Sequence, residues 1–129
     1  MKIGELAKLT GCSIQSIRYY EKEGLLNSIL RSEGNFRLYN DESVRQLIFI
    51  KRCRSLDISL SEINQLSSLK ATPEQNCNDV NKLFDKHLQQ VDLKIAELKK
   101  LKSQLLDLRH KCSDEHIVED CAIIQKLMQ

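Results

Sequence analysis

The amino-acid sequence predicts a mainly α protein. Only four Gly and one Pro occur in 129 residues, which is too few turn-forming residues for an architecture built of β-strands. Long segments rich in Leu, Lys, Gln and Glu have high helix propensity, and apolar residues recur along them at intervals of three and four. A chain of this length can form one compact domain with one long appendage, and is too short for a multidomain enzyme.

Composition and charge narrow the class of function. The chain is 41% hydrophobic and 29% charged, which is ordinary for a globular protein. It has no run of about 18 apolar residues that could span a membrane, and its first residues lack the apolar core of a signal peptide. We therefore expect a cytoplasmic protein with no membrane partner. Residues 1–56 carry ten Lys and Arg against six Asp and Glu, a net charge of +4, which makes this part the candidate for binding nucleic acid.

Two short helices joined by a Gly-containing turn are expected at about residues 4–23. Ser13 can cap the second helix, which buries Ile14 and Ile17. Gly24 stands where a helix commonly ends, because glycine accepts the left-handed conformation found there. This arrangement is a helix-turn-helix.

A short hairpin is expected after the helix-turn-helix. Gly34 and Asn35 can form a tight turn between two extended runs that carry Arg31 and Arg37. Such a hairpin is a wing, and its cations can neutralise the phosphates of a DNA backbone. An ordinary hairpin with two exposed arginines is the alternative.

The second helix supplies the other half of a candidate DNA-binding surface. Opposite its isoleucines it presents polar and basic side chains, which can hydrogen-bond base edges or bind phosphates in a major groove. A solvated helix face would look the same by itself, but the neighbouring wing favours DNA. The candidate DNA-binding residues are Ser13, Gln15, Ser16, Arg18, Tyr19, Arg31, Asn35 and Arg37.

Three further helix starts follow. Asn40 or Asp41 can cap a third helix, and Ser59 with Glu62 has the pattern of a capping box for a fourth. The run Thr72-Pro73-Glu74-Gln75 is typical of a helix N-terminus with proline at its first position, and no residue from there to about position 111 breaks a helix. The chain therefore divides into a winged helix-turn-helix (residues 1–71), a long helix (72–111) and a loop with a short helix (112–129).

The long helix carries an apolar stripe that a single chain cannot bury. Its steps of three and four residues do not follow a simple heptad repeat. They become regular if two copies pack antiparallel, because facing residues such as Phe84 and Leu105, or Val91 and Leu98, then have numbers with one constant sum. We therefore predict an antiparallel coiled-coil homodimer. The stripe consists of Phe84, Leu88, Val91, Ile95, Leu98, Leu101, Leu105 and Leu108.

Three of the five cysteines form a pattern in this dimer. Disulfides are not expected, because the cytosol is reducing and the number of cysteines is odd. Cys77 and Cys112 are roughly 50 Å apart along one helix, but their numbers have the same sum as the facing pairs of the stripe. Cys77 of one chain would therefore lie beside Cys112 and Cys121 of the other, and three thiolates suit a soft or borderline cation.

The remaining candidate ligands are better explained by ordinary packing or solvation. Cys12 and Cys53 have no comparable partners, so we expect them to act as small apolar residues of the core. His116 could be a fourth ligand, but a solvated loop histidine is the simpler interpretation.

Four segments resemble the MerR family of transcriptional regulators. The resemblance covers the whole chain and implies a winged helix-turn-helix with an antiparallel dimerisation helix. It also implies binding to a promoter whose −35 and −10 elements are too far apart, which an inducer-loaded dimer bends and untwists so that RNA polymerase engages both. The segments are Ile3-Gly4-Glu5-Leu6-Ala7, Ile17-Arg18-Tyr19-Tyr20-Glu21 through Gly24-Leu25-Leu26, Gly34-Asn35-Phe36-Arg37-Leu38-Tyr39 and Arg52-Cys53-Arg54-Ser55-Leu56.

Within this family, the cysteine spacing and the residues around it look most like the branch that senses cadmium and lead. The resemblance implies Cd(II) or Pb(II) as effector on Cys77, Cys112 and Cys121, with Hg(II) and Zn(II) as further candidates. Zinc sensors of the family usually carry adjacent cysteines after the long helix, whereas here Ser113 follows Cys112.

Two other functions compete with a metal-responsive activator. One is a redox-sensing regulator in which Cys112 and Cys121 form a disulfide, although such a switch has no use for Cys77. The other is an architectural DNA-binding dimer without an effector. An enzyme is not expected, because the three histidines have no nucleophile or carboxylate pair arranged with them and the sequence has no Gly-rich phosphate loop.

Overall fold

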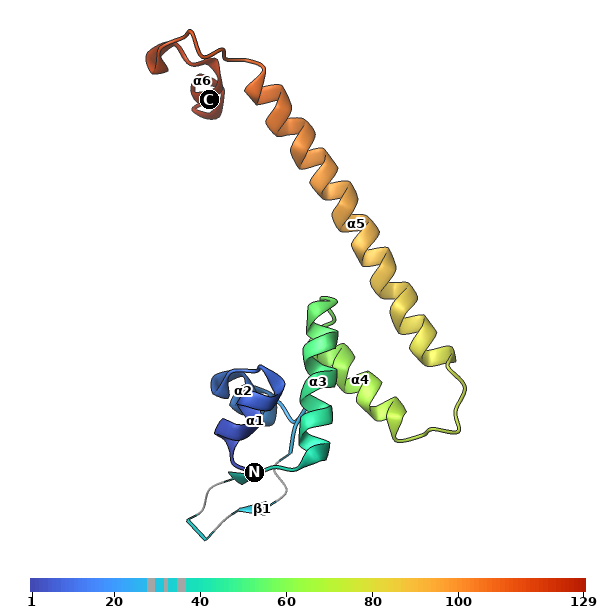
Figure 1. Ribbon diagram of the computed structural model, residues 1–129. Coiled ribbons are helices and arrows are strands. Elements are labelled where there is room, and N and C mark those ends of the chain that lie inside the picture. Colours follow the sequence, from blue (N-terminus) through green and yellow to red (C-terminus); the bar gives the residue numbers. More distant parts are fainter. Residues whose placement is uncertain (28–29, 32, 35–36) are drawn as a thin grey trace. The chain divides into compact units, whose positions relative to one another are not determined.

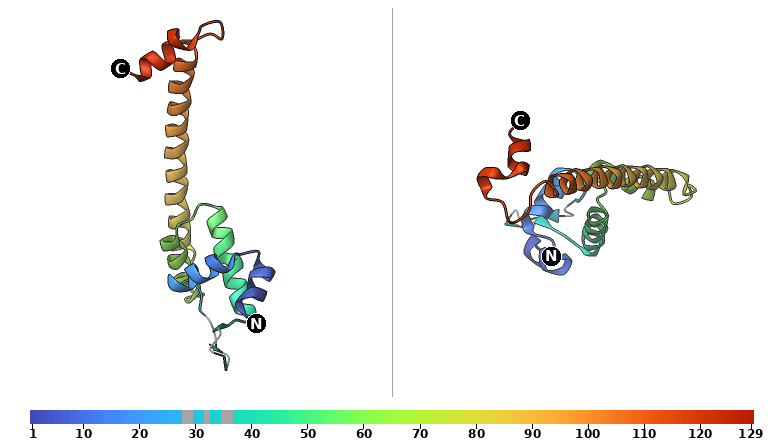
Figure 2. Two further views of the ribbon diagram at one scale, coloured as in Figure 1. Left: turned by 90° about the vertical axis from the view of Figure 1, so that its left-hand side faces the viewer. Right: turned by 90° about the horizontal axis from the view of Figure 1, so that it is seen from above.

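The computed structural model describes residues 1–27, 30–31, 33–34 and 37–129 and is mostly helical (Figures 1 and 2). This confirms the predicted fold class. The chain forms two compact units, residues 1–83 and residues 84–129, and the longest helix crosses their boundary. The elements are α1 (Ile3–Thr10), α2 (Ile14–Lys22), β1 (Leu30–Arg31), β2 (Arg37–Leu38), α3 (Asp41–Ser55), α4 (Leu60–Lys70), α5 (Asn78–Arg109), the 3-10 helix η1 (Val118–Asp120) and α6 (Ala122–Leu127).

The residues predicted to cap and end the second helix do so in the structure, and the expected helix-turn-helix is formed. The Ser13 side chain accepts a hydrogen bond from the Ser16 backbone N–H at 3.0 Å and so caps α2. Beyond the end of α2, Gly24 has φ 77°, and the Leu25 N–H donates to the Tyr20 carbonyl at 2.9 Å. This is the closing hydrogen bond of a Schellman motif, which satisfies a carbonyl left over at the helix end.

Substitutions at two glycines can show how backbone conformation contributes to the stability of the fold without a change in packing. A Cβ added at Gly4, in α1, or at Gly24 would meet no heavy atom within 4 Å. We expect Gly4→Ala to stabilise the fold by up to about 1 kcal/mol, because alanine favours a helix. We expect Gly24→Ala to cost about 1–2 kcal/mol, because its φ is left-handed. Thermal unfolding at one fixed protein concentration checks both, and shifts of the same sign would contradict this account.

Capping boxes start α3 and α4. Asn40 accepts from the Ser43 backbone N–H at 3.1 Å, and the Asn40 N–H donates to the Ser43 hydroxyl at 3.2 Å. Ser59 and Glu62 make the same reciprocal pair at 3.1 and 3.0 Å. Each box satisfies two backbone donors that the helix itself cannot pair. The sequence predicts the box of Ser59 and Glu62, and it leaves the cap of α3 open between Asn40 and Asp41.

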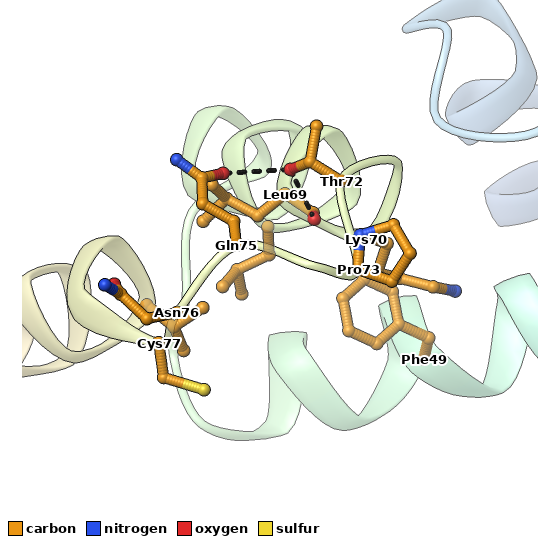
Figure 3. A pocket seen from close by; sticks show the side chains of 10 residues that line it. Phe49, Leu69, Lys70, Thr72, Pro73, Gln75, Asn76 and Cys77 are labelled. Atoms are coloured by element: carbon orange, nitrogen blue, oxygen red, sulfur yellow. Dashed lines mark hydrogen bonds between the residues drawn. The ribbon is translucent and has the colours of Figure 1, made fainter.

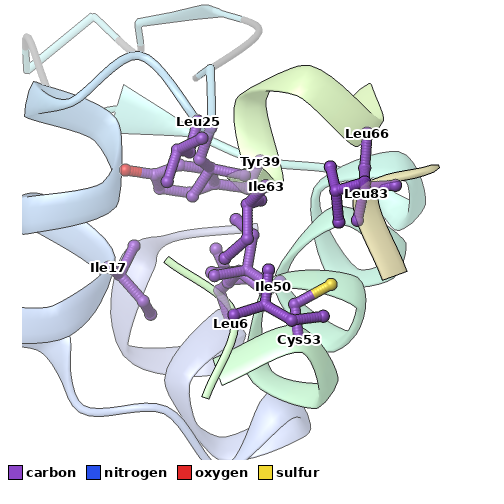
Figure 4. Packing of buried hydrophobic residues seen from close by; sticks show 12 residues of the cluster. Leu6, Ile17, Leu25, Tyr39, Ile50, Cys53, Ile63, Leu66 and Leu83 are labelled. Carbon is purple, nitrogen blue, oxygen red and sulfur yellow. The ribbon is translucent and has the colours of Figure 1, made fainter. Parts of the chain in front are cut away.

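The hydrophobic core of residues 1–83 joins the helix-turn-helix to α3, α4 and the first turns of α5 (Figure 4). Cys53 is 6% exposed and belongs to this core, as expected, while Cys12 is half-buried against it. Ile17 is fully buried, but Ile14 is 40% exposed. The expectation that α2 buries both isoleucines is therefore wrong, because Ile14 is the first residue of α2 and lies outside the core.

The long helix starts later than the sequence predicts. The Thr72 hydroxyl is hydrogen-bonded to the Leu69 carbonyl at 3.1 Å and to the Gln75 side-chain oxygen at 2.9 Å. It therefore does not cap a helix by accepting from a backbone N–H. The Gln75 N–H in turn donates to the Thr72 carbonyl at 3.0 Å. These local bonds close a separate turn, and α5 begins only at Asn78.

The α5 stripe is open to solvent in a single chain. Each of its residues from Phe84 to Leu105 is at least 39% exposed, and Leu98 is 63% exposed. An apolar surface of this length is unusual for a monomeric protein. After α5 the chain forms a loop, η1 and the short α6, which lie within the segment of residues 112–129 where the sequence predicts a loop and a short helix.

Candidate DNA surface and cysteine site

The outward face of α2 carries the expected polar residues. The side chains of Gln15, Arg18 and Tyr19 are exposed, and an open depression on this face is lined by Gln15, Ser16, Arg18, Tyr19 and Lys22. Ser13 and Ser16 are partly committed to each other, because the Ser13 hydroxyl also donates to the Ser16 hydroxyl at 2.9 Å. Arg18 and Tyr19, both exposed, lie on the central turn of α2.

The expected wing is present as a two-stranded antiparallel pair. Arg31 of β1 is the register partner of Arg37 of β2, so the two candidate phosphate-binding residues occupy paired positions. Asn35 lies outside the described residues.

Lys51 is a structural residue of this region that sequence reasoning missed. Its ammonium group, from α3, donates to the Thr10 carbonyl at the end of α1 at 3.2 Å. A Cβ at Gly11 would lie 2.8 Å from the same nitrogen. Lys51 therefore holds the turn between α1 and α2, and no local pattern reveals a contact across 41 residues.

We expect Arg18→Ala to weaken DNA binding without changing metal stoichiometry, since Arg18 is an exposed cation at the centre of the α2 face. Loss of one phosphate contact should also lower the slope of log affinity against log salt by about one unit. Fluorescence anisotropy over a salt series measures both. Arg45→Ala is the matched control, because Arg45 is an exposed arginine of α3 already paired with Glu42 at 2.7 Å. Equal losses of DNA affinity in the two variants would show that Arg18 acts only through the net charge of the protein.

The loop after α5 brings Cys112 and Cys121 together. Their side chains lie within hydrogen-bonding reach of each other, and the Cys112 thiol also contacts the Ser113 carbonyl at 3.4 Å. Cys112 follows the end of α5 and Cys121 immediately precedes α6. The chain reversal between them is the polar segment that the sequence predicts as a loop.

The two sulfurs differ in acidity. The N–H groups at the start of α6, chiefly that of Ile124, lower the pKa of the Cys121 thiol, and the Cys112 thiol lowers it further. The same thiol–thiol contact raises the pKa of Cys112, with Cys121 as its principal cause. Cys121 is therefore the sulfur that first carries negative charge in this pair, which favours binding of a cation.

Neighbouring side chains fix the conformation of the loop. The Arg109 guanidinium donates to the Cys112 carbonyl at 2.8 Å and lies 3.9 Å from the Asp114 carboxylate. The ring nitrogen Nδ1 of His116 is hydrogen-bonded to the Ser113 hydroxyl at 2.9 Å. This bond occupies one ring nitrogen of His116 within the loop.

Cys77 is exposed and stands immediately before α5. The Asn81 N–H donates to its carbonyl at 2.9 Å, so Cys77 occupies the N-cap position. Its side chain lines a cavity of about 270 Å³ together with apolar residues such as Phe49 and Val80 (Figure 3). The ammonium group of Lys70 lies 5.4 Å from the centre of the Phe49 ring at this cavity.

The described residues of one chain do not form a complete metal site. Among the described residues, no three His, Cys, Asp or Glu side chains converge in a way that could hold an ion. The pair of Cys112 and Cys121 supplies two soft ligands, fewer than a closed thiolate site needs.

Among the residues that the structure describes, no helix has the length and apolar character needed to cross a membrane.

Family models match nearly the whole chain. The model described as "MerR HTH family regulatory protein" matches residues 1–70, and the model described as "MerR, DNA binding" matches residues 44–108. An "HTH-type transcriptional regulator ZntR homolog" of Haemophilus influenzae is 48% identical over 111 residues, which are 86% of this chain and 82% of the relative.

Two solved structures with bound metal are similar in fold and sequence. The transcription regulator PbrR691 of Ralstonia metallidurans, solved in complex with lead(II), has a TM-score of 0.88 and 47% identity, with 98% of each chain covered. The regulator MerR of Bacillus megaterium, solved in complex with mercury(II), has a TM-score of 0.74 and 30% identity, with 100% of each chain covered.

Proposed function

Because this chain belongs to the MerR family of helix-turn-helix regulatory proteins, which are DNA-binding transcription regulators and not enzymes, we propose the following activity for it. It binds a promoter as a homodimer and activates transcription when Cd(II) or Pb(II) binds Cys77, Cys112 and Cys121. The observation that carries the metal assignment is the contact between the Cys112 and Cys121 side chains at the end of α5.

The third ligand comes from the partner chain in this proposal. A helix of 32 residues such as α5 is about 48 Å long, and Cys77 precedes it while Cys112 follows it. An antiparallel partner places its own Cys77 at the end of α5 where Cys112 and Cys121 lie. Each dimer then holds two sites, and each site draws ligands from both chains.

Thiolate chemistry supports a heavy divalent metal as the effector. Sulfur ligands favour soft and borderline cations over Mg²⁺ or Ca²⁺, which prefer oxygen. Similar regulators have been solved with lead(II) and mercury(II), and the cysteine spacing resembles the cadmium and lead branch. We therefore place Cd(II) and Pb(II) before Hg(II) and Zn(II).

Bound metal would act on DNA through the dimer. A site that joins two chains fixes the geometry of the α5 pair only when it is filled, and this pair carries a helix-turn-helix at each end. In the proposed mechanism, the filled dimer bends and untwists the promoter, and RNA polymerase then engages the −35 and −10 elements together.

Transcription in vitro from the bound promoter, titrated separately with Cd(II), Pb(II), Hg(II) and Zn(II), tests this function. We expect Cd(II) or Pb(II) to activate at the lowest free concentration and Cys121→Ser to abolish the response. The control variant Cys12→Ser changes a half-buried cysteine outside the site and should respond normally. Activation by none of the four metals would contradict the proposal.

A redox-sensing regulator is the second candidate, and the contact between Cys112 and Cys121 favours it as well. A peroxide could accept two electrons from these thiols and leave them joined as a disulfide, with the two thiol protons passing to the water formed. Cys77→Ser separates the candidates, because it removes a metal ligand but leaves both redox thiols. A variant that keeps an oxidant response would support the redox function, and loss of the metal response would support the metal function.

A further inference from the structure

A buried tyrosine connects the wing to the DNA-facing helix. Tyr39 directly follows β2 and is 3% exposed. Its hydroxyl lies 3.1 Å from the Glu21 carboxylate oxygen Oε2 and donates to it. Glu21 lies in the last turn of α2, one turn after Arg18. Figure 4 shows the Tyr39 hydroxyl leaving the apolar cluster on the side of α2.

The contact spans two elements that must act together on DNA. The antiparallel pair of β1 and β2 holds the candidate phosphate-binding arginines, and Tyr39 comes two residues after Arg37. The Tyr39 backbone is held by a hydrogen bond from its N–H to the Met1 carbonyl at 2.8 Å, and Asn40 next to it caps α3. Tyr39 is therefore a fixed point against which the end of α2 is held.

The negative charge of Glu21 favours a position of its carboxylate away from DNA. A carboxylate on a helix that faces DNA is repelled by phosphates, while Arg18 and Lys22 on the same helix are attracted to them. A charge-assisted hydrogen bond to a buried hydroxyl is stronger than a neutral one. It therefore holds the Glu21 carboxylate on the core side of α2.

We propose that Tyr39 and Glu21 form a positioning pair that sets the orientation of α2 relative to the wing, and thereby the affinity and sequence specificity of DNA binding. Neither residue needs to touch DNA for this role. The proposal is independent of the metal and of its cysteine ligands.

The test uses the full-length protein without metal and the duplex that the wild-type protein selects from a random-sequence pool, with a scrambled duplex beside it. Tyr39→Phe removes only the hydroxyl. We expect it to weaken binding to the selected duplex by roughly ten- to a hundredfold, a change of the size expected for one charge-assisted hydrogen bond, and to leave binding to the scrambled duplex nearly unchanged. Glu21→Gln keeps an oxygen acceptor and should retain most of the specificity.

A double-mutant comparison completes the test. Glu21→Leu should lose specificity to the same extent as Tyr39→Phe, and the double variant should be no worse than either single variant. A contact that only stabilises the fold would lower the melting temperature of Tyr39→Phe and leave the ratio of selected to scrambled affinity unchanged below that temperature. That result would overturn the proposal, as would additive losses in the double variant.

Discussion

Leu98→Asp is expected to convert the dimer into monomers. Leu98 lies at the centre of the α5 stripe and is 63% exposed in one chain, and in the proposed antiparallel pair it would face Val91 of a second copy. By symmetry the variant places two carboxylates in an apolar interface, each costing several kcal/mol. The dissociation constant should rise by about three orders of magnitude or more. Sedimentation equilibrium at micromolar concentration measures it.

Leu93→Asp is the matched control for this experiment. Leu93 is an equally exposed leucine of α5, at 65%, but it lies about 140° around the helix from Leu98 at 100° per residue. The stripe assignment predicts that Leu93→Asp remains a dimer. A Leu98→Asp protein that sediments as a stable dimer would show that the stripe is not the interface.

The helix-turn-helix could be predicted from sequence because its signals are local. Ser13 and Ser59 cap the helices that they are expected to cap, and of the two candidates for α3 it is Asn40 that caps the helix. Each of these caps interacts with a backbone group three residues ahead. Gly24 adopts the left-handed conformation for the same local reason. Patterns of this kind depend on a few neighbouring residues and not on the rest of the fold.

Competition between local signals explains the misplaced start of α5. The Thr72-Pro73-Glu74-Gln75 run has the residue types of a helix N-terminus, but the same side chains can close a turn. In the structure Thr72 bonds to Leu69 and Gln75, and Asn76 accepts from the Asn78 N–H at 3.0 Å, just before the helix. The residue types of this run alone do not decide between these two local arrangements.

Contacts between residues far apart in the sequence could not be predicted from local patterns. Lys51 with Thr10, and Tyr39 with Glu21, are 41 and 18 residues apart and involve ordinary polar residues. The sequence did suggest that Cys112 and Cys121 lie together, because thiol groups have a distinctive chemistry and both residues fall in the segment predicted to form a loop and a short helix. Lysine, tyrosine and glutamate have several common roles in proteins, so their presence in the sequence does not indicate which residues they contact.

The proposed sharing of each metal site between two chains predicts a specific behaviour of a mixed dimer. One chain carries Cys77→Ser, and the other carries Cys112→Ser and Cys121→Ser. If each site combines Cys77 of one chain with Cys112 and Cys121 of the other, one site of this heterodimer loses all three thiolates and the other keeps all three. We expect one tightly bound metal per dimer, with thiolate-to-metal charge-transfer absorption at about half the wild-type amplitude.

Sites confined to single chains would give a different result. Neither chain of the heterodimer would then hold a complete set of ligands, and no metal would bind tightly. The homodimer of each variant is the control, because both models predict that it has no complete site. A verified heterodimer without a tight site would exclude sharing, and the proposed link between metal binding and the geometry of the α5 pair would fail with it, because metal could then bind without joining the two chains.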